Sequence, residues 1–343
     1  MSVRVLRPGA LATVQDLGRG GLQHLAIVPG GAMDRASHRI ANALVGNRRD
    51  SATLEIALSG PELLFNDVTL VALHGARFEA ALDGAAFPAS RPVLVRAGAR
   101  LRIGRATEGC FGYLAVAGGI EVPLVLGSRC TYLPGGFGGL DGRLIATGGT
   151  LPVAANADTV SASRFARITA QGSTVVVGAG AGQSVRWHAP PLTLPSTDPP
   201  VVQAVEGAHA ELFAEAARAA FFGERWRVAP DSNRMGFRLL GPKLDLLRPT
   251  EIVSQATCLG TVQVPANGQP IVLMADHQTT GGYPKIAEVI VADVPALAQV
   301  PPGGSVRFLK ATFEDADSAR ERFETRVAKL VERILWEFSD EDD

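Results

Sequence analysis

Short apolar runs separated by turn residues dominate this 343-residue chain and constrain what it can fold into. The sequence holds 38 glycines and 22 prolines, and these residues bound most of the runs. Because glycine and proline favour turns, each run predicts a short β-strand rather than a long helix. The predicted strands are 70–73, 92–103, 111–117, 174–177, 201–205, 236–240, 261–264, 271–275, 288–292 and 305–309. Many short strands at this spacing are typical of barrels and sandwiches.

Three segments show the periodicity of amphipathic helices. Residues 34–44 begin at Asp34, and residues 208–222 stop at Gly223. Residues 313–338 carry apolar residues at steps of three and four, with charged residues on the other face. We therefore predict a mainly β protein with a few helices, ending in a C-terminal amphipathic helix. Its apolar stripe is expected to pack on the same chain, and partner binding is the alternative.

The length suggests two domains, because domains commonly span about 100–200 residues. Residues 155–163 are small and polar, and a new strand pattern begins after Gly172. The predicted division is therefore a β-barrel domain over 1–165, a second β-barrel domain over 166–311, and a helix with an acidic tail over 312–343.

Charge and targeting signals exclude several classes of partner. The 33 basic and 34 acidic residues leave no basic excess for nucleic-acid binding. The first twenty residues include Arg4 and Arg7 and lack a signal-peptide core, and no run reaches the ~18 apolar residues of a membrane helix. The cysteines Cys110, Cys130 and Cys258 are odd in number and far apart, which favours a reduced, cytoplasmic setting.

Several familiar catalytic motifs are absent from the sequence. It contains no Gly-x-x-x-x-Gly-Lys-Ser/Thr phosphate loop, and the six histidines show no paired metal spacing, so no metal is predicted. No lysine stands beside a methionine, so covalently carried biotin is not expected. The glycine-rich segment 178–182 follows a strand but precedes no helix pattern, which favours a hairpin over a dinucleotide loop.

The first candidate cluster lies at residues 28–35. Gly30 and Gly31 precede a predicted helix, whose backbone N–H groups and dipole favour an anion. Met33 and Asp34 complete this candidate substrate-binding segment. A tight turn capped by Asp34 explains the same residues equally well.

The second candidate cluster lies at residues 232–238. Asn233 offers both a donor and an acceptor, and Arg234 offers a planar fork suited to a carboxylate or phosphate. The alternative is a turn followed by a solvated strand face.

The third cluster, residues 276–285, is the densest in functional groups. Lys285 is one of only four lysines, and it can act as a charge or, if desolvated, as a base. Glycine pairs allow close backbone approach to a ligand, so we favour a site over a polar hairpin tip. Its candidate residues are Gln278, Thr279, Thr280, Gly281, Gly282, Tyr283 and Lys285, with Gln255, Thr261, Gln263, Pro265 and Asn267 lining the same cleft if the two hairpins pair.

With these clusters, the sequence resembles the 5-oxoprolinase C-subunit family, also described as biotin-dependent carboxyltransferase-like or allophanate hydrolase subunit 2-like, with a Kip-type anti-antagonist branch. The resemblance covers nearly the whole chain. The segments that carry it are 7–9, 13–19, 30–34, 41–47, 54–55, 60–61, 117–120, 126–129, 135–139, 233–236, 260–265 and 278–285.

The resemblance implies two cyclophilin-like β-barrel domains. It also implies a subunit of an ATP-dependent 5-oxoprolinase complex, which opens 5-oxoproline to L-glutamate in a cleft formed with a partner. The expected partners are the other two members of that complex, namely its A subunit, of the lactam-utilisation type, and its Kip-type inhibitor-like B subunit. ATP is expected to be used by the complex. One alternative is a biotin-dependent carboxyltransferase acting on a urea-like amide. The other is a regulatory protein that sequesters a Kip-type kinase inhibitor.

In the oxoprolinase interpretation, Lys285, Asn233 and Gln278 are the candidate catalytic residues. Asn233 and Arg234 would hold the substrate carboxylate, while Lys285 and the backbone of 278–282 stabilise charge on the reacting oxygen. The sequence departs from the family pattern at Gln255, where a glutamate is common. That change removes a carboxylate from the expected cleft.

Overall fold

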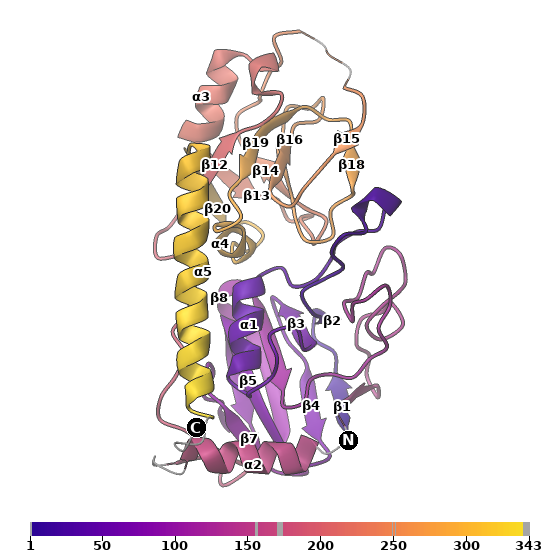
Figure 1. The fold of residues 1–343 in the computed structure, drawn as a ribbon, viewed down its shortest axis with the longest axis vertical. Helices are drawn as coiled ribbons and strands as arrows, with labels where there is room; N and C mark the ends of the chain where they lie inside the picture. The colour runs from indigo at the N-terminus through magenta and orange to yellow at the C-terminus, as the bar shows by residue number, and fades with distance from the viewer. Residues whose placement is uncertain (1, 155–156, 170–173, 249, 251, 339–343) are drawn as a thin grey trace. The chain divides into compact units, whose positions relative to one another are not determined.

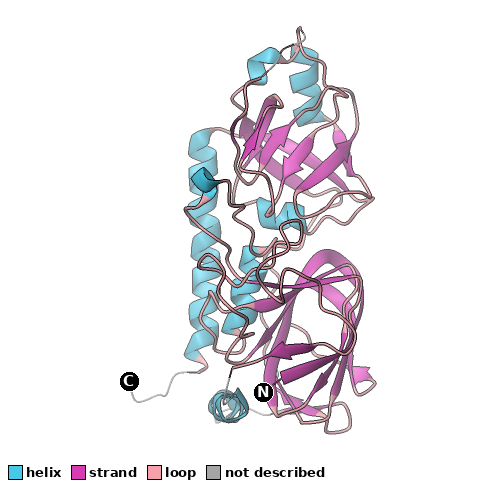
Figure 2. Cartoon of the chain, turned by 90° about the vertical axis from the view of Figure 1, so that its right-hand side faces the viewer, coloured by secondary structure: helices cyan, strands magenta, loops and turns pink. Residues whose placement is uncertain are grey.

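The computed structural model describes residues 2–154, 157–169, 174–248, 250 and 252–338. Across these residues the chain forms twenty strands, five α-helices and two short 3-10 helices, so the predicted mainly β class is confirmed (Figure 2). No helix within the described part of the chain is long and apolar enough to cross a membrane.

The chain divides into two compact units, and neither is continuous in sequence. The first unit comprises Met1–Gly18, Arg35–Leu194 and Arg326–Asp343, and the second comprises Arg19–Asp34 and Pro195–Thr325. The predicted boundary between residues 165 and 166 lies inside a helix, α2 (Ala157–Thr169). The contacts therefore divide the chain at different places from those suggested by composition.

An eleven-stranded antiparallel sheet forms the frame of the first unit (Figure 1). Its main path runs β10-β11-β7-β5-β8-β4-β1-β9, with β3 also on β8, β2 on β3 and β6 on β5. The two longest strands, β5 and β8, pair with each other along most of their length. The strands are β1 (Ser2–Arg7), β2 (Leu11–Gln15), β3 (Thr53–Ala57), β4 (Glu62–Phe65), β5 (Thr69–Leu82), β6 (Ala85–Ala86), β7 (Val93–Val95), β8 (Arg100–Val116), β9 (Thr150–Pro152), β10 (Val175–Val177) and β11 (Gly182–Ser184).

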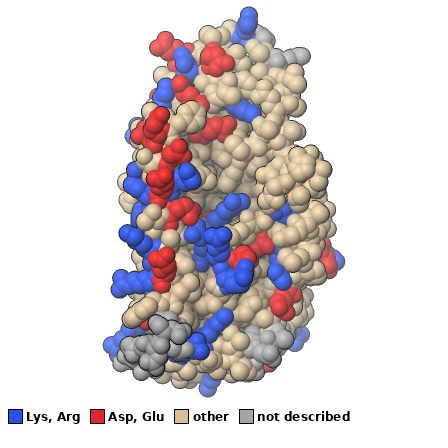
Figure 3. All heavy atoms as spheres, in the orientation of Figure 1, with Lys and Arg blue, Asp and Glu red and all other residues tan. Residues whose placement is uncertain are grey.

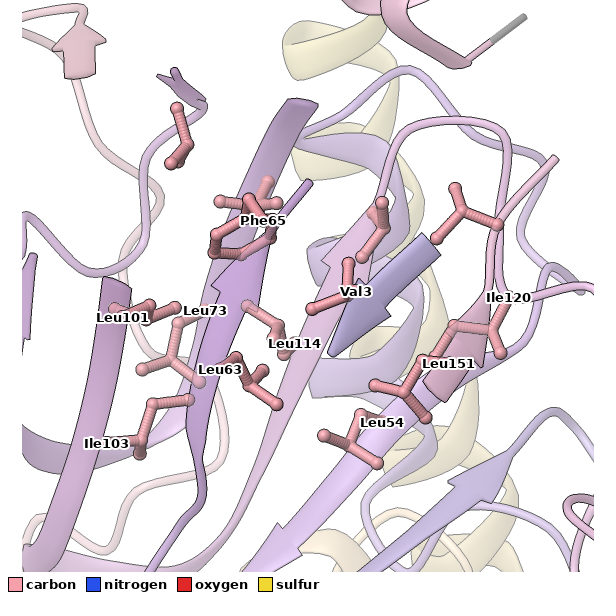
Figure 4. Packing of buried hydrophobic residues seen from close by; sticks show 14 of the residues in the cluster. Val3, Leu54, Leu63, Phe65, Leu73, Leu101, Ile103, Leu114, Ile120 and Leu151 are labelled. Atoms are coloured by element: carbon pink, nitrogen blue, oxygen red, sulfur yellow. The ribbon is translucent and has the colours of Figure 1, made fainter. Parts of the chain in front are cut away.

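Alternating apolar residues from these strands form the core of the first unit (Figure 4). Leu54, Leu63 and Phe65 are fully buried, and Leu101 and Leu114 meet them from β8. Each such side chain contributes about 1.5–3 kcal/mol when removed from water. Helix α1 (Arg35–Ala43) packs against β5 and β8.

The second unit is built around a closed seven-stranded barrel with the order β12-β19-β16-β17-β14-β13-β20. The strands β12 and β20 run parallel, and the other neighbours run antiparallel. A separate two-stranded ladder joins β15 (Gln255–Ala256) to β18 (Thr280–Gly281). The barrel strands are β12 (Val201–Glu206), β13 (Arg225–Val228), β14 (Gly236–Leu240), β16 (Thr261–Gln263), β17 (Ile271–Leu273), β19 (Lys285–Val289) and β20 (Ser305–Lys310).

The helices follow the predicted segments closely at both ends of the chain. Helix α5 (Phe313–Trp336) buries Val327 and Ile334, while acidic and basic side chains alternate along its exposed side (Figure 3). The predicted helix over 208–222 is instead a 3-10 turn, η2 (Ala210–Leu212), followed by α3 (Glu215–Gly223). The sequence did not predict α2, α4 (Val294–Ala298) or the 3-10 turn η1 (Gln23–Leu25).

The strand predictions are accurate where an apolar run is local and uninterrupted. The predicted strand 236–240 coincides with β14, whereas 92–103 is broken by a turn into β7 and the start of β8. The predicted strand 288–292 is misplaced, because β19 begins at Lys285 and ends at Val289. The glycine-rich segment 178–182 forms the predicted hairpin between β10 and β11.

Candidate functional site

The residues of the third sequence cluster lie on one wall of the barrel in the second unit. The strands β16 and β19 form that wall (Figure 1). The short ladder β15–β18, which we call the flap, is joined to it by a hydrogen bond from the Lys285 side chain to Ala256. The flap exists because Gln255 pairs with Gly281 and Ala256 with Thr280. The predicted pairing of these two segments is therefore present.

Lys285 is buried at the start of β19, with 7% of its surface exposed. Its ammonium Nζ donates to the carbonyl oxygen of Ala256 on the flap, at 2.5 Å. Its backbone is held by His209, whose Nδ1 accepts from the Lys285 N–H at 3.2 Å and whose own backbone N–H donates to the Lys285 carbonyl at 3.1 Å. An ammonium has three N–H donors, and the described residues provide one acceptor for them, the carbonyl of Ala256. The remaining N–H groups of Lys285 can therefore donate to a ligand oxygen.

Gln263 and Gln278 form an amide pair beside Lys285. The Nε2 of Gln278 donates to the Oε1 of Gln263 at 3.1 Å. Gln263 is 1% exposed, and among the described residues its Nε2 has no hydrogen-bond partner. That nitrogen faces Gly281, where an added Cβ would clash with it. A buried amide donor without an acceptor is costly, so this donor is suited to a ligand oxygen.

A β-bulge at Ile286 determines which side chains share this wall. Thr261 pairs with Glu288 and Gln263 pairs with Lys285, so three steps along β19 oppose two steps along β16. Side chains normally alternate between the faces of a strand, and an extra residue resets that alternation. Lys285 and Glu288 consequently lie on the same face as Thr261 and Gln263.

Glu288 brings a carboxylate to this face that the sequence did not identify as a site residue. The Sγ of Cys258 donates to its Oε2 at 3.4 Å and lies 3.3 Å from the Oγ1 of Thr261. Burial raises the pKa of Glu288, whereas hydrogen bonds from Thr261 and Cys258 and the charge of Lys285 oppose that rise. One signal was present in the sequence, namely an acidic residue inside the apolar run 286–292.

The remaining residues of the third cluster shape the edge of the flap. Thr279 is buried and its carbonyl accepts from the Thr257 N–H at 3.0 Å, while Thr280 is exposed. Tyr283 is 50% exposed and lines a mostly apolar pocket of about 660 Å³. The other residues of that pocket are Leu244, Asp245, Leu246, Thr250, Ile252, Val264, Pro265, Ala266, Gly282 and Pro284.

Arg234 makes a buried ion pair within the protein. Its Nε and Nη2 donate to the two carboxylate oxygens of Asp276, both at 2.8 Å, and Nη2 also donates to the carbonyl of Gly31 at 2.7 Å. The planar fork identified in the sequence is thus directed at a carboxylate of the chain itself. Asn233 is exposed, and its Oδ1 accepts from the Met235 N–H at 2.8 Å in a turn.

The segment with Gly30 and Gly31 is bound to the same barrel. Both glycines have positive φ, at 63° and 85°, a conformation that other residues rarely adopt. The Gly30 N–H donates to the carbonyl of Ala275 at 3.1 Å, and Asp34 accepts from the Nε2 of Gln299 at 2.8 Å. Met33 is buried. These bonds favour the tight-turn alternative for this segment.

The three sequence clusters therefore fall into two groups on one unit. Lys285, Gln263 and Gln278 meet under the flap, whereas Arg234 and the glycine turn meet at Asp276. The two groups are joined through residues 276–278 of the chain. Among the described residues, no group of three histidine, cysteine, aspartate or glutamate side chains is placed to hold a metal ion.

The second unit is thus a closed β-barrel that carries a two-stranded flap beside a wall lined with hydrogen-bond donors. The carboxyltransferase domain family, subdomains A and B, matches residues 25–310, and the chain belongs to that family. It is 38% identical to the C subunit of 5-oxoprolinase from Escherichia coli (strain K12), over 99% of this chain and 100% of the relative. It is 36% identical to the C subunit of 5-oxoprolinase from Haemophilus influenzae, over 96% of this chain and 97% of the relative.

Solved structures show the same fold inside longer chains. The crystal structure of the Kluyveromyces lactis urea carboxylase superposes with a TM-score of 0.83 at 31% identity, covering 96% of this chain and 29% of that chain. The structure of TTHA0988 superposes with a TM-score of 0.73 at 34% identity, covering 90% of this chain and 55% of that chain. The chain thus corresponds to part of each of these longer proteins.

Proposed function

We propose that this chain is the C subunit of a cytoplasmic, ATP-dependent 5-oxoprolinase complex, which opens 5-oxoproline to L-glutamate together with the A and B subunits. The observation that carries the proposal is the end-to-end match with the C subunit of the Escherichia coli 5-oxoprolinase, over 99% of this chain and 100% of the relative. By contrast, the chain spans 18% of the urea amidolyase of Saccharomyces cerevisiae.

The geometry of the wall supports an amide substrate. In this proposal, Lys285 Nζ and Gln263 Nε2 donate to the lactam oxygen as negative charge develops on it, and Gln278 holds the Gln263 amide in place. Prearranged donors in a site shielded from water stabilise such charge strongly, because little reorganisation is needed. The flap residues Thr279, Thr280, Gly281, Gly282 and Tyr283 form the border of the substrate site.

Binding of the substrate carboxylate is assigned to Asn233, in the turn before β14. Arg234 acts through Asp276 and the carbonyl of Gly31, so it positions the 276–278 segment and the glycine turn. Gly30, Met33 and Asp34 contribute by keeping that turn bound to the barrel. We assign ATP to the complex as a whole, since this sequence has no phosphate loop.

The proposal is tested by reconstituting the complex with its A and B subunits and measuring ATP-dependent glutamate release. The substitution Lys285→Ala should lower kcat by about 10²–10³-fold, the usual cost of losing a donor to a developing oxyanion. Lys310→Ala, at an exposed position of β20, is the matched control and should retain activity. Glutamate release that is unchanged in Lys285→Ala would remove Lys285 from the site, and an inactive wild-type complex would remove the proposed function.

A second candidate function is biotin-dependent carboxyl transfer to a urea-like amide. It is favoured by the TM-score of 0.83 with the Kluyveromyces lactis urea carboxylase. In that case free biotin should bind the chain, and calorimetric titration of biotin into the chain would detect it. A purely regulatory role would instead give a tight complex with the B subunit that is insensitive to substitution at Lys285 and Asn233.

A further inference from the structure

The bulge at Ile286 places the Lys285 ammonium and the Glu288 carboxylate on one face of the barrel wall. Lys285 and Glu288 are three residues apart and would point to opposite faces of a regular strand. Because Lys285 pairs with Gln263 and Glu288 pairs with Thr261 across the bulge, Lys285 and Glu288 lie on the same face. The Gly207 N–H donates to the carbonyl of Ile286 at 2.9 Å, which holds the extra residue in place.

We propose that Glu288 is the proton acceptor of this site, taking the proton from the N–H of the substrate amide. The inference rests on the proposed function. As the amide N–H bond breaks, its proton passes to the Glu288 carboxylate. The nitrogen electrons shift onto the amide oxygen, which bonds to the γ-phosphorus of ATP while the bond to ADP breaks. Lys285 and Gln263 hold the oxygen during this step.

The spacing of the wall fits an amide group between these residues. Two steps along a strand cover about 7 Å, so the Thr261–Glu288 pair lies about 7 Å along β16 from the Gln263–Lys285 pair. In a five-membered lactam the C=O and N–H lie on the same side of the C–N bond, so the donor to its oxygen and the acceptor from its nitrogen are about 3–7 Å apart. The backbone spacing of about 7 Å lies at the long end of that range, and the long side chains of Lys285, Gln263 and Glu288 can lean together to bind a lactam.

The groups around Glu288 suit a carboxylate that must gain and lose a proton. Cys258, in the loop before β16, and Thr261, on β16, hydrogen-bond to Glu288. Lys285 is the charged group on the same strand as Glu288. On the other neighbouring strand, β12, Glu288 pairs with Val205, and the adjacent Glu206 is ion-paired with Arg218 and Lys310. Gln255 on the flap is neutral, so the flap supplies no second carboxylate that could accept the proton in place of Glu288.

The first test measures the pH dependence of glutamate release by the reconstituted complex. Glu288→Gln, which keeps the shape of the side chain, should lower kcat by on the order of 100-fold or more, the contribution of a positioned general base. It should also abolish the acidic limb of the pH profile, because that limb reports protonation of Glu288. A glutamine variant with wild-type kcat and an unchanged limb would overturn the inference while leaving the proposed function intact.

The second test uses Cys258 to shift the protonation of Glu288 without removing the carboxylate. The thiol hydrogen bond lowers the pKa of Glu288, so Cys258→Ala should move the acidic limb to higher pH. Cys258→Ser keeps a donor at the same position and should leave the limb near its wild-type place. Equal profiles for the alanine and serine variants would contradict the role of Glu288 as the titrating group.

The contact itself is tested on the isolated full chain, independently of activity. Burial raises the pKa of the Cys258 thiol, and the charge and hydrogen bond of Glu288 raise it further. Glu288→Gln should therefore speed alkylation of Cys258 by iodoacetamide at pH 8, whereas Cys110 and Cys130 are buried. An unchanged alkylation rate would refute the geometry. If instead the wild-type complex releases no glutamate, the proposed function and this inference fail together.

Discussion

At the scale of single residues, the buried pair of Arg234 and Asp276 is the main electrostatic contact beside the site. Their side chains are 6% and 3% exposed, and the two hydrogen bonds between them are both 2.8 Å long. Removing one partner of such a pair leaves an uncompensated buried charge. We therefore expect this pair to matter more for stability than for direct contact with substrate.

Arg234→Met should lower the free energy of unfolding by about 3–5 kcal/mol, because the Asp276 carboxylate loses its partner. The double variant Arg234→Met with Asp276→Leu should recover much of that loss. Arg238→Met is the matched control, since Arg238 is exposed and its ion pair with Asp231 contributes at most about 1 kcal/mol. Urea unfolding of the three variants measures the effect, and equal losses for Arg234 and Arg238 would contradict it.

Residue types could be predicted from the sequence more readily than their partners. Lys285 stands out because the chain has few lysines, and the structure buries it beside the flap. The partner of Arg234 is 42 residues away, and no local pattern indicates that separation. Glu288 was missed because its place on the wall depends on a bulge, which strand periodicity does not reveal.

At the scale of elements, the flap and the barrel wall meet through Gly281. A side chain at this position would clash with the buried amide of Gln263, so with β18 this close to β16 any residue larger than glycine would push that amide aside. The sequence suggested close backbone approach to a ligand here. The structure shows close approach to another side chain of the same protein, which in turn orients that amide.

Gly281→Ala should displace the Gln263 amide and lower kcat for glutamate release on the order of 100-fold, since small misplacements at a reacting centre are costly. Gly223→Ala, at the end of α3, is the matched control, because beyond its chain neighbours and its own helix nothing lies within 4 Å of the added Cβ. Steady-state kinetics of the reconstituted complex distinguish the two. Full activity in Gly281→Ala would show that the Gln263 amide is not part of the site.

Element types could be predicted where local periodicity decides them, as for β14 and α5. The errors lie where tertiary contacts decide. The small, polar residues 155–163 suggest a boundary, yet α2 begins at Ala157 and contacts β5. The first residues of that segment, 155–156, and residues 170–173 lie outside the described part of the chain.

At the scale of the whole molecule, two histidines buried in the first unit give its stability a dependence on pH. Burial lowers the pKa of both His38 and His74 to about 4 from the ordinary 6.5. Between pH 6.5 and 4 the unfolded chain therefore binds more protons than the folded chain. The stabilisation is complete above pH 6.5 and is lost progressively as the pH falls towards 4.

By pH 5 each of these histidines should have reduced the free energy of unfolding by about 2 kcal/mol relative to pH 7. His74→Asn removes one of the two groups and should flatten the pH dependence by about half. His24→Gln, at an exposed position, is the control and should behave like the wild type. Urea unfolding at pH 5, 6 and 7 measures these slopes, and identical slopes for His74→Asn and wild type would contradict the assignment.

The interleaving of the two units along the chain has a consequence for how the protein emerges from the ribosome. The first unit includes residues from Arg326 onward, and the second includes both Arg19–Asp34 and the residues up to Thr325. The second unit can close its barrel only when β20 has been made, whereas the core of the first unit is supplied by residues between Val3 and Ala181. Strands such as β3 and β5 can therefore be covered while the rest of the chain is still being made, and closure of the second unit is the later event.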